Sequence, residues 1–451
     1  MVFKKRVSDN TLPKGDVLLL QVPRANEKKE LAAEQLFASL HGLLMGTDKQ
    51  RFKPLHRERV SFEIAVQHKR IGFYVWVPDH LKSFVEEQIY AQYPTVHISE
   101  VPDYTFAETS PTAQLSAELK FTAHEALPIK TFPSFEVDPL AAITAALAQF
   151  EENEEAWLQF IIRPAQEGWY KKSERYALSI RGGKNSTKGI LGALWAPPEV
   201  KTETPKLAEH ESARATAAES KSHKLAYETT LRIVYRGQTS ADQARMRIQA
   251  ITATFKQFNT TYLNGFAHKI LGESQQYVDN YRSRSMVRSG FVCNIEEVAS
   301  LYHLPHTNVE TPNILWANAQ TAEPPANLPL VSESTRDNVS PMAVTNFRGH
   351  NTMFGIPRED RGRHLYIIGQ TGVGKSGLLE LLTISDIHSP YGFAVIDPHG
   401  DYAMNIMRRI PKERAQDVIY FNPADTDFPI AFNPMEVLDE KLKSHTCSEL
   451  I

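Results

Sequence analysis

The residues of this chain best suited to chemistry lie at 369–376, directly after the apolar run 364–368. Their order is Gly-x-x-x-x-Gly-Lys-Ser, and between a strand and a helix this motif is a phosphate-binding P-loop. The glycines allow backbone amides to turn toward phosphate oxygens, Lys375 would meet the β- and γ-phosphates, and Ser376 would bind Mg²⁺. We therefore predict that ATP and Mg²⁺ bind at Gly369, Gln370, Thr371, Gly372, Val373, Gly374, Lys375 and Ser376.

A second group of candidate residues follows in the run 392–401, Gly-Phe-Ala-Val-Ile-Asp-Pro-His-Gly-Asp. An apolar strand that ends at Asp397 would place this carboxylate on the same edge of a sheet as the P-loop, and Asp401 would follow at the start of a helix. Two carboxylates near a γ-phosphate could hold Mg²⁺ through water and activate the attacking water. We predict Lys375, Asp397 and Asp401 as catalytic residues, with Asp397 and Ser376 at the metal.

A structural interpretation of the same run stays open. Asp401 would then be only a helix N-cap, and Asp397 a turn former at the end of a strand. His399 is expected to support the turn rather than to take part in chemistry.

Residues 362–435 resemble the motor domain of the HerA/FtsK superfamily of DNA-pumping ATPases, and within it the TraG/TraD-like coupling proteins of conjugation and type IV secretion. The segments that carry the resemblance are 363–376, 395–401, 418–425 and 429–434. It implies a homo-hexameric ring with DNA in its pore, and proteins of a secretion or conjugation machinery as further partners.

The resemblance also implies that Asp397 and Asp401 belong to the hydrolytic site, although Asp401 stands where Glu is usual. Motors of this kind carry a Walker B strand, a sensor residue and an arginine for the neighbouring site further along, and none is recognisable before Ile451. We therefore expect an incomplete motor domain. The 451-residue chain itself would be mostly monomeric, bind ATP weakly and hydrolyse none.

Three functions are open at this point. The leading one is an ATP-driven DNA translocase that acts like a coupling protein in conjugation or type IV secretion. The first alternative is a HerA-type helicase or translocase for DNA processing. The second is a nucleotide-binding scaffold without turnover.

The composition of the 451 residues limits the class of protein. The formal net charge of −3 favours no particular partner, and two cysteines without metal spacing suit a reducing cytosol. No run of about 18 apolar residues is present, so no transmembrane helix is expected. The predicted location is the cytoplasm, or the inner face of the cell membrane through partners.

The predicted fold class is α/β: an incomplete RecA-like P-loop motor domain preceded by an α+β region of ferredoxin-like and αβ-repeat character. Residues 1–105 read strand, helix, two strands of a hairpin, helix, strand, which is the order of a ferredoxin-like sandwich.

The rest of the chain is predicted as four segments. Residues 106–195 and 224–330 would form αβ segments, and each contains a strand that ends in arginine, which suggests a duplicated unit. Residues 196–223, rich in Ala, Glu, Ser and Lys, would be a disordered linker or a solvated insertion. Residues 331–451 would form the N-terminal part of the P-loop domain, with its first strand at 347–354.

Three other groups of polar residues are interpreted as structural. A basic and aromatic group could bind DNA, but a solvated loop explains it more simply. Three scattered histidines show no metal spacing, and three arginines before the P-loop are expected to pair with Glu359 and Asp360. These groups are Tyr277, Tyr281, Arg282, Arg284 and Arg288; His303, His306 and His364; and Arg358, Arg361 and Arg363.

Overall fold

The computed structural model of the chain describes residues 14–45, 57–107, 111–181, 209–286, 290–317, 323–347, 351–389 and 391–429. The chain divides into two compact units, Met1–Ala322 and Glu323–Ile451. The first contains a nine-stranded sheet whose paired strands are antiparallel. None of the described helices is both long and apolar enough to cross a membrane.

The first half of this sheet has the predicted ferredoxin-like order of elements. Its strands are arranged β4-β1-β3-β2, and β2 and β3 form a hairpin whose turn residues His68 and Lys69 both have positive φ. Positive φ at both central positions suits the twist of a two-residue hairpin turn. The elements are β1 (Gly15–Gln21), α1 (Glu30–Leu44), β2 (Val60–Gln67), β3 (Arg70–Pro78), α2 (Lys82–Gln92) and β4 (His97–Val101).

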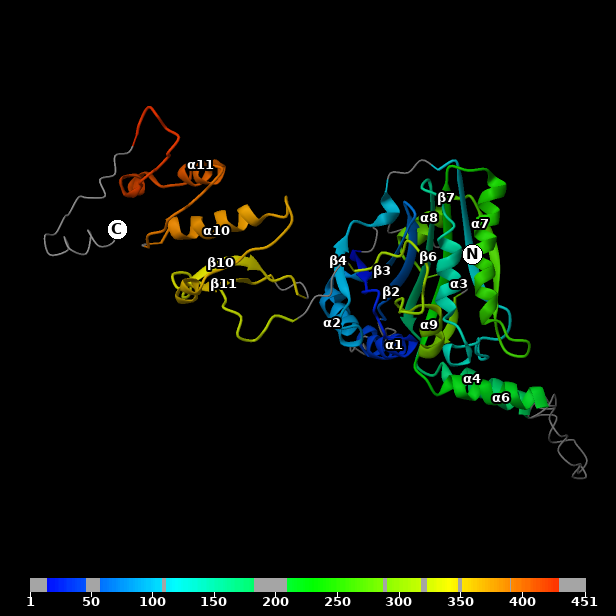
Figure 1. The fold of residues 1–451 in the computed structure, drawn as a ribbon. Coiled ribbons are helices and arrows are strands. Elements are labelled where there is room, and N and C mark those ends of the chain that lie inside the picture. The colour runs from blue at the N-terminus through cyan, green and yellow to red at the C-terminus, as the bar shows by residue number, and fades with distance from the viewer. Residues whose placement is uncertain are drawn as a thin grey trace, which may run out of the picture. The chain divides into compact units, whose positions relative to one another are not determined.

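The second half repeats this arrangement. Its strand order is β6-β7-β5-β8, so the first, second, third and fourth strands of each half occupy equivalent places, and β2 pairs with β6 where the halves meet. Figure 1 labels most of these elements in the first unit. They are β5 (Ala113–Phe121), α3 (Pro139–Leu147), β6 (Glu154–Pro164), β7 (Ala226–Gly237), α7 (Ala241–Thr254) and β8 (Phe266–Gly272).

The duplication therefore differs from the one suggested by the sequence. The two strands that end in arginine are β6 and β7, and they pair with each other, with Trp157 opposite Val234. Segments 106–195 and 224–330 thus supply parts of one βαββαβ unit, and the other copy is formed by the residues before them. An insertion between β6 and β7 separates the two parts in the sequence.

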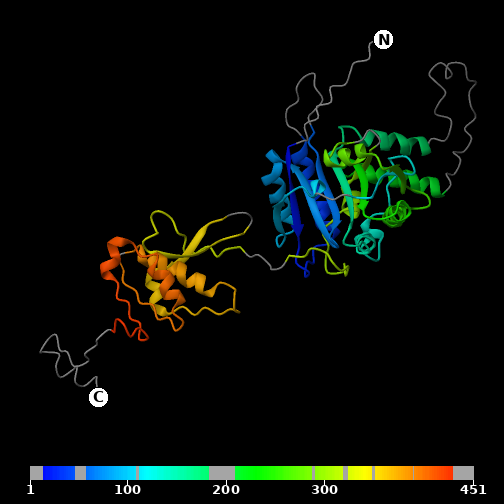
Figure 2. The same cartoon turned by 90° about the horizontal axis from the view of Figure 1, so that it is seen from above.

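Part of this insertion was predicted as a disordered linker, and that prediction is wrong for Glu209–Ser222, which form helix α6. Helix α6 packs on α4 (Tyr170–Arg181), and Figures 1 and 2 show the two helices side by side. Alanine-rich sequence allows close helix packing: Ala177, Ala215 and Ala218 are all fully buried. Residues 196–208 of the predicted linker lie outside the described residues.

The helices α1, α2, α3 and α7 share one large apolar core with a face of the sheet, together with α9 (Ile295–Leu301). The opposite face carries a smaller aromatic cluster. There, Trp76 and Trp157 are covered by Tyr104 and by α8 (Gln275–Arg282), which contributes Tyr281. A short strand, β9 (Phe291–Asn294), pairs with the start of β7 and leads directly into α9.

The second unit contains a hairpin of β10 (Val339–Val344) and β11 (Met353–Pro357), then α10 (Lys375–Ile387) and α11 (Asp401–Met407). The strand predicted at 347–354 is thus displaced to β11.

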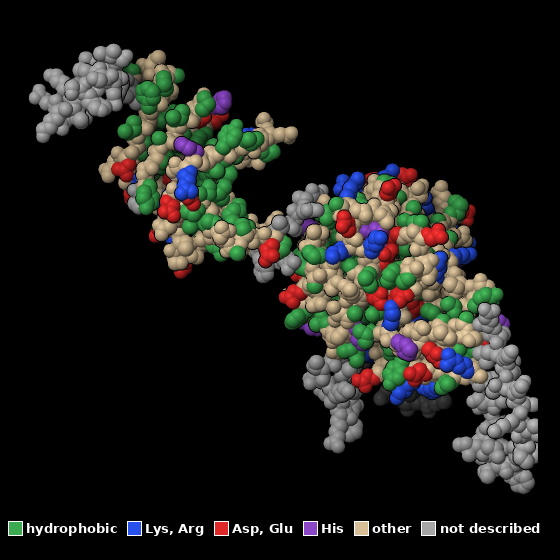
Figure 3. All heavy atoms as spheres, turned by 60° about the horizontal axis from the view of Figure 1, so that its bottom comes forward, with side chains coloured by type: hydrophobic (Ala, Val, Ile, Leu, Met, Phe, Trp, Pro, Cys, Tyr) green, Lys and Arg blue, Asp and Glu red, His purple; other side chains and the backbone are tan. Residues whose placement is uncertain are grey.

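The apolar runs at 364–368 and 393–397, predicted as strands, form no strand among the described residues, and neither does the segment at 418–422, so a RecA-like sheet is not confirmed. A parallel strand forms only when neighbours accept and donate its backbone hydrogen bonds. Ile396 and Ile419 are accordingly 96% and 90% exposed, and Figure 3 shows many apolar side chains on the visible face of this unit.

One buried ion pair generates a stability prediction. Lys221 at the end of α6 lies 3.0 Å from Glu297 of α9, and both side chains are fully buried. Lys221→Met leaves the Glu297 carboxylate buried and uncompensated, so we expect a loss of about 3–5 kcal/mol in the free energy of unfolding. Urea unfolding followed by tryptophan fluorescence measures this unit alone, because all five tryptophans precede residue 317.

Lys224→Met is the matched control. Lys224 pairs with Glu34 and Glu296, but its side chain is 36% exposed. The control should lose no more than about 1 kcal/mol. Equal losses in the two variants would contradict the role given to the buried pair.

Candidate nucleotide-binding site

The loop 369–376 has the backbone conformation that a P-loop needs. Gly372 and Gly374 have φ of 87° and 95°, which side chains with a Cβ rarely adopt. A Cβ on Gly369 would lie 2.6 Å from the Cγ2 atom of Val373. The conformation of this loop therefore requires glycine at 372 and 374, whereas a side chain at 369 would displace that of Val373; Gly374 is the N-cap of α10.

Lys375 is held over the loop it belongs to. Its ammonium donates hydrogen bonds to the carbonyl oxygens of Gly369, at 2.9 Å, and Gln370, at 2.8 Å. Residues 369–374 and Ser376 are exposed and Lys375 is partly buried, so an anion can approach the first turn of α10 from solvent. The positive end of a helix and a lysine at one place form an anion-binding site.

The second predicted group forms a turn that Asp397 holds together. Its carboxylate accepts hydrogen bonds from the amides of His399, at 3.0 Å, and Ala403, at 3.1 Å. These backbone hydrogen bonds lower the pKa of Asp397 below its usual range, so it stays ionised. Gly400, with φ of 87°, is the N-cap of α11, and Asp401 is its exposed first residue. Asp401 is therefore not the N-cap of the structural interpretation, whereas Asp397 does organise the turn.

The helices α10 and α11 are joined by side chains that bring the two groups into one unit. The Tyr402 hydroxyl lies 2.5 Å from the Thr383 hydroxyl and donates to the carbonyl oxygen of Leu379 at 3.3 Å. Asn405 donates to Glu380 at 3.4 Å. The helix that follows the P-loop thus carries the helix that begins at Asp401.

Asp386 near the end of α10 is a residue that the sequence analysis missed. It pairs with Arg358, at 2.9 Å, and with Arg361, so these arginines do not pair with Glu359 and Asp360 as predicted. This contact raises the pKa of Arg361. Only the remaining arginine, at 363, pairs as expected, with Asp360 at 3.6 Å.

A cavity of about 730 Å³ lies beside α11. Its lining is mostly apolar and includes Phe393, Ile406 and Tyr420 as well as Asp397. Phosphates need donors and positive charge, and Arg414 in this lining already donates to the carbonyl oxygens of Ile387 and Ser389. The loop 369–376 instead offers Lys375 and the start of α10. The cavity is therefore not the phosphate site.

The basic and aromatic group in the first unit is not the solvated loop that was expected, because Tyr277, Tyr281 and Arg282 lie in α8 and part of the group is buried. Arg284 is buried against Glu63, at 3.2 Å, and Asp103. Tyr281 is also buried, and Arg282 donates to the carbonyl oxygen of Thr105. The remaining arginine of this group, at 288, lies outside the described residues.

Comparison with known families assigns both parts of the chain. Residues 8–317, more than half of the 451, match the model of the family described as Domain of unknown function (DUF8128). The chain belongs to the DUF8128 family. Residues 358–446 match the model described as Helicase HerA, central domain. No curated protein matches the chain.

The HerA match covers the loop 369–376 and both carboxylates, Asp397 and Asp401. It supports the HerA/FtsK P-loop superfamily that the motifs suggest, and such a domain implies nucleotide binding with a metal ion. It also points to an ATPase motor that assembles into oligomers. The DUF8128 region precedes this domain and contains the duplicated sheet.

The loop geometry predicts that alanine weakens nucleotide binding at one glycine, Gly374, and not at another, Gly377. Gly374→Ala forces a Cβ into a left-handed conformation, so we expect at least about tenfold weaker nucleotide binding. Gly377→Ala is the control, because Gly377 lies inside α10 and an added methyl group there would meet no neighbouring atom. Titration with a fluorescent nucleotide measures both. Equal affinity in the two variants would contradict the geometry.

Proposed function

We propose that the second unit is an ATP-binding motor of the HerA type that moves DNA. The observation that carries this proposal is the loop 369–376, where left-handed glycines, Lys375 and the start of α10 converge inside the segment that matches HerA. ATP is the expected nucleotide and Mg²⁺ the expected metal, since this is the combination that P-loop motors use.

Each side chain of the site would have a separate role. Lys375 would leave its two carbonyl partners and meet the phosphates, and the Ser376 hydroxyl would hold Mg²⁺. Bound ATP supplies the phosphoanhydride whose cleavage drives the motor. Both oxygens of Asp397 already accept backbone amides, so Asp397 positions the turn and would reach Mg²⁺ through water. Asp401, exposed on the first turn of α11, would orient or deprotonate the attacking water.

We favour a role in DNA processing over a role as a coupling protein of conjugation or type IV secretion. The matched model carries the name of the HerA helicase, whereas a role in conjugation or type IV secretion rests on the sequence resemblance alone. The partners we propose are DNA and, in a hexameric ring, further copies of the chain. An arginine from the neighbouring copy would stabilise charge on the γ-phosphate in such a ring.

The nucleotide assignment has a direct test. Lys375→Ala removes the charged donor of the loop, and a hydrogen bond to a charged group contributes about 1.5–3 kcal/mol, so ATP affinity should fall at least about tenfold. Lys412→Ala is the control, because Lys412 is an exposed lysine of the same unit. Calorimetric titration with ATP and Mg²⁺ compares the two. Unchanged affinity in Lys375→Ala would remove the basis of the proposal.

The motor assignment predicts assembly that depends on ligands. A protein that carries the complete motor domain should form hexamers with ATP and DNA, and DNA should accelerate its ATP turnover. Mass photometry and a phosphate-release assay measure these two properties. A protein that binds ATP but stays monomeric with DNA would retain the nucleotide site and exclude the ring.

A further inference from the structure

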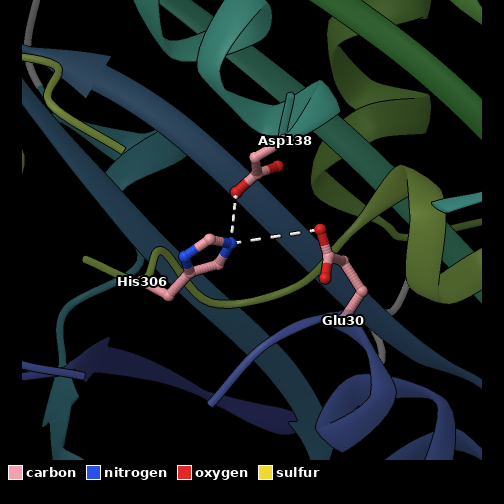
Figure 4. Close-up of side chains that lie close together, drawn as sticks. All are labelled: Glu30, Asp138 and His306. Carbon is pink, nitrogen blue, oxygen red and sulfur yellow. Dashed lines mark ion pairs between the residues drawn. The ribbon is translucent and has the colours of Figure 1, made fainter. Parts of the chain in front are cut away.

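A buried polar cluster lies in the first unit, outside the nucleotide site. It joins Glu30, the first residue of α1, to Asp138, the N-cap of α3, and to His306, on the segment after α9. Figure 4 shows both carboxylates facing the Nε2 side of the His306 ring. The side chains of Asp138 and His306 are only 1% and 3% exposed, and that of Glu30 is 14% exposed.

The two oxygens of Asp138 differ in their partners. Oδ1 accepts hydrogen bonds from the amide of Leu140, at 2.7 Å, and from the Nε2 atom of His303, at 2.9 Å. The Nδ1 atom of His303 in turn donates to the carbonyl oxygen of Ala299. This second contact fixes the His303 ring, and with it the direction of the Asp138 carboxylate.

The other oxygen, Oδ2, and the Nε2 atom of His306 form an ion pair, but neither atom has a hydrogen bond of good geometry among the described residues, and both are buried. They lie 3.0 Å apart, and the Oε1 atom of Glu30 lies 3.9 Å from the same nitrogen. Buried polar atoms are nearly always satisfied. This ion pair is poorly aligned for a hydrogen bond, and the carboxylate of Glu30 faces the same ring nitrogen (Figure 4).

We propose that Glu30, Asp138 and His306 bind a divalent transition metal ion such as Zn²⁺. Imidazole and carboxylate are its usual nitrogen and oxygen ligands, at about 2.0–2.2 Å. Two ligands of one ion can then be no more than about 4.3 Å apart. The two distances of 3.0 and 3.9 Å meet this limit, and all three ligand atoms lie within 4.8 Å of one another. Glu30, the most exposed of the three, needs only a small side-chain movement.

The other polar contacts of His306 indicate how metal binding would change its protonation. The contacts of His306 with Asp138 and Glu30 raise its pKa to about 9, so without a metal a proton on the ring balances the carboxylates. The ion would take the place of that proton on Nε2. The amide of Asn308 lies 3.3 Å from Nδ1, a distance typical of a weak hydrogen bond, and it can donate there only when the ring carries a single proton on Nε2. In the charged ring, as in the metal-bound ring, Nδ1 carries a proton, so metal binding would cost no hydrogen bond at Nδ1.

His303 acts through Asp138 and would not contact the ion. A ligand carboxylate that accepts a hydrogen bond from a fixed second residue is the common arrangement around protein-bound zinc. The elements joined in this way are α1 from the first half of the sheet unit and α3 from the second, with the segment after α9 between them. The site would therefore hold the two copies of the βαββαβ unit together.

The test uses the whole 451-residue chain after treatment with a chelator. Zn²⁺ is titrated in competition with a chromogenic chelator, and Co²⁺ is added to the unmodified protein to record its visible absorption. We expect one Zn²⁺ per chain, a Co²⁺ spectrum of low-symmetry nitrogen and oxygen coordination, and a higher midpoint of thermal unfolding with Zn²⁺. Glu30→Gln and His306→Gln should each weaken Zn²⁺ binding at least about tenfold.

Two controls separate this site from surface binding. Glu27→Gln changes an exposed carboxylate just before α1, and His268→Gln changes an exposed imidazole on β8. Both should bind Zn²⁺ as the unmodified chain does. Glu30→Gln replaces a partly exposed side chain, so it remains informative if His306→Gln does not fold. Absence of stoichiometric binding, or equal affinity in Glu30→Gln and Glu27→Gln, would show that the cluster holds protons only.

Discussion

The pairing of β2 with β6 is the contact on which the first unit depends. Seven residue pairs, from Val60 opposite Ile162 to Val66 opposite Ala156, join the two βαββαβ copies through strands that would otherwise be sheet edges. An unpaired edge exposes backbone donors and acceptors to other chains. The pairing of β2 with β6, which we call the seam, satisfies the backbone hydrogen bonds of both edges at once. It also makes their two helical layers continuous, because α1, α9 and α3 then cover one sheet and share one core.

Buried polar side chains join distant segments on both faces of the sheet. On the aromatic face, Glu63 of β2 accepts a hydrogen bond from Gln159 of β6 at 2.9 Å, directly across the seam, and the Arg284 guanidinium balances its charge. On the helical face, the capping box of α9, formed by Asn294 and Glu297, leaves Glu297 to pair with Lys221. Glu63 and Glu297 thus join segments distant in sequence, and each has a charged partner.

The features formed by residues that are neighbours in the chain could be predicted from the sequence. The hairpin of β2 and β3, the loop 369–376 and the turn at Asp397 are formed by neighbours in the chain, through glycine conformations and side chains that bond to nearby amides. The second βαββαβ copy is hidden in the sequence, because an insertion separates β6 from β7. Helix α6 of that insertion has the composition of a linker, because a sequence rich in alanine and charged residues is typical both of a solvated segment and of a closely packed helix.

The partners of Asp386 and His306 could not be predicted for a related reason. Arg361 lies 25 residues before Asp386, and Asp138 lies more than 150 residues before His306, so no spacing rule connects either pair. The sequence led to the interpretation of His306 as a structural residue. His306 does join distant elements of the fold, but the sequence could not show that it does so by facing two carboxylates.

The two units of the chain hold their acidic groups in related ways. Asp138 caps α3 and Glu30 opens α1, while Asp397 bonds the amides that begin α11. Backbone amides at a helix start favour the ionised carboxylate, so each group keeps its charge. In the second unit these charges lie close to solvent, where a nucleotide and its metal can reach them. In the first unit they lie at the junction of two repeated halves, so whatever cation balances them, a proton on His306 or a metal ion, also stabilises that junction.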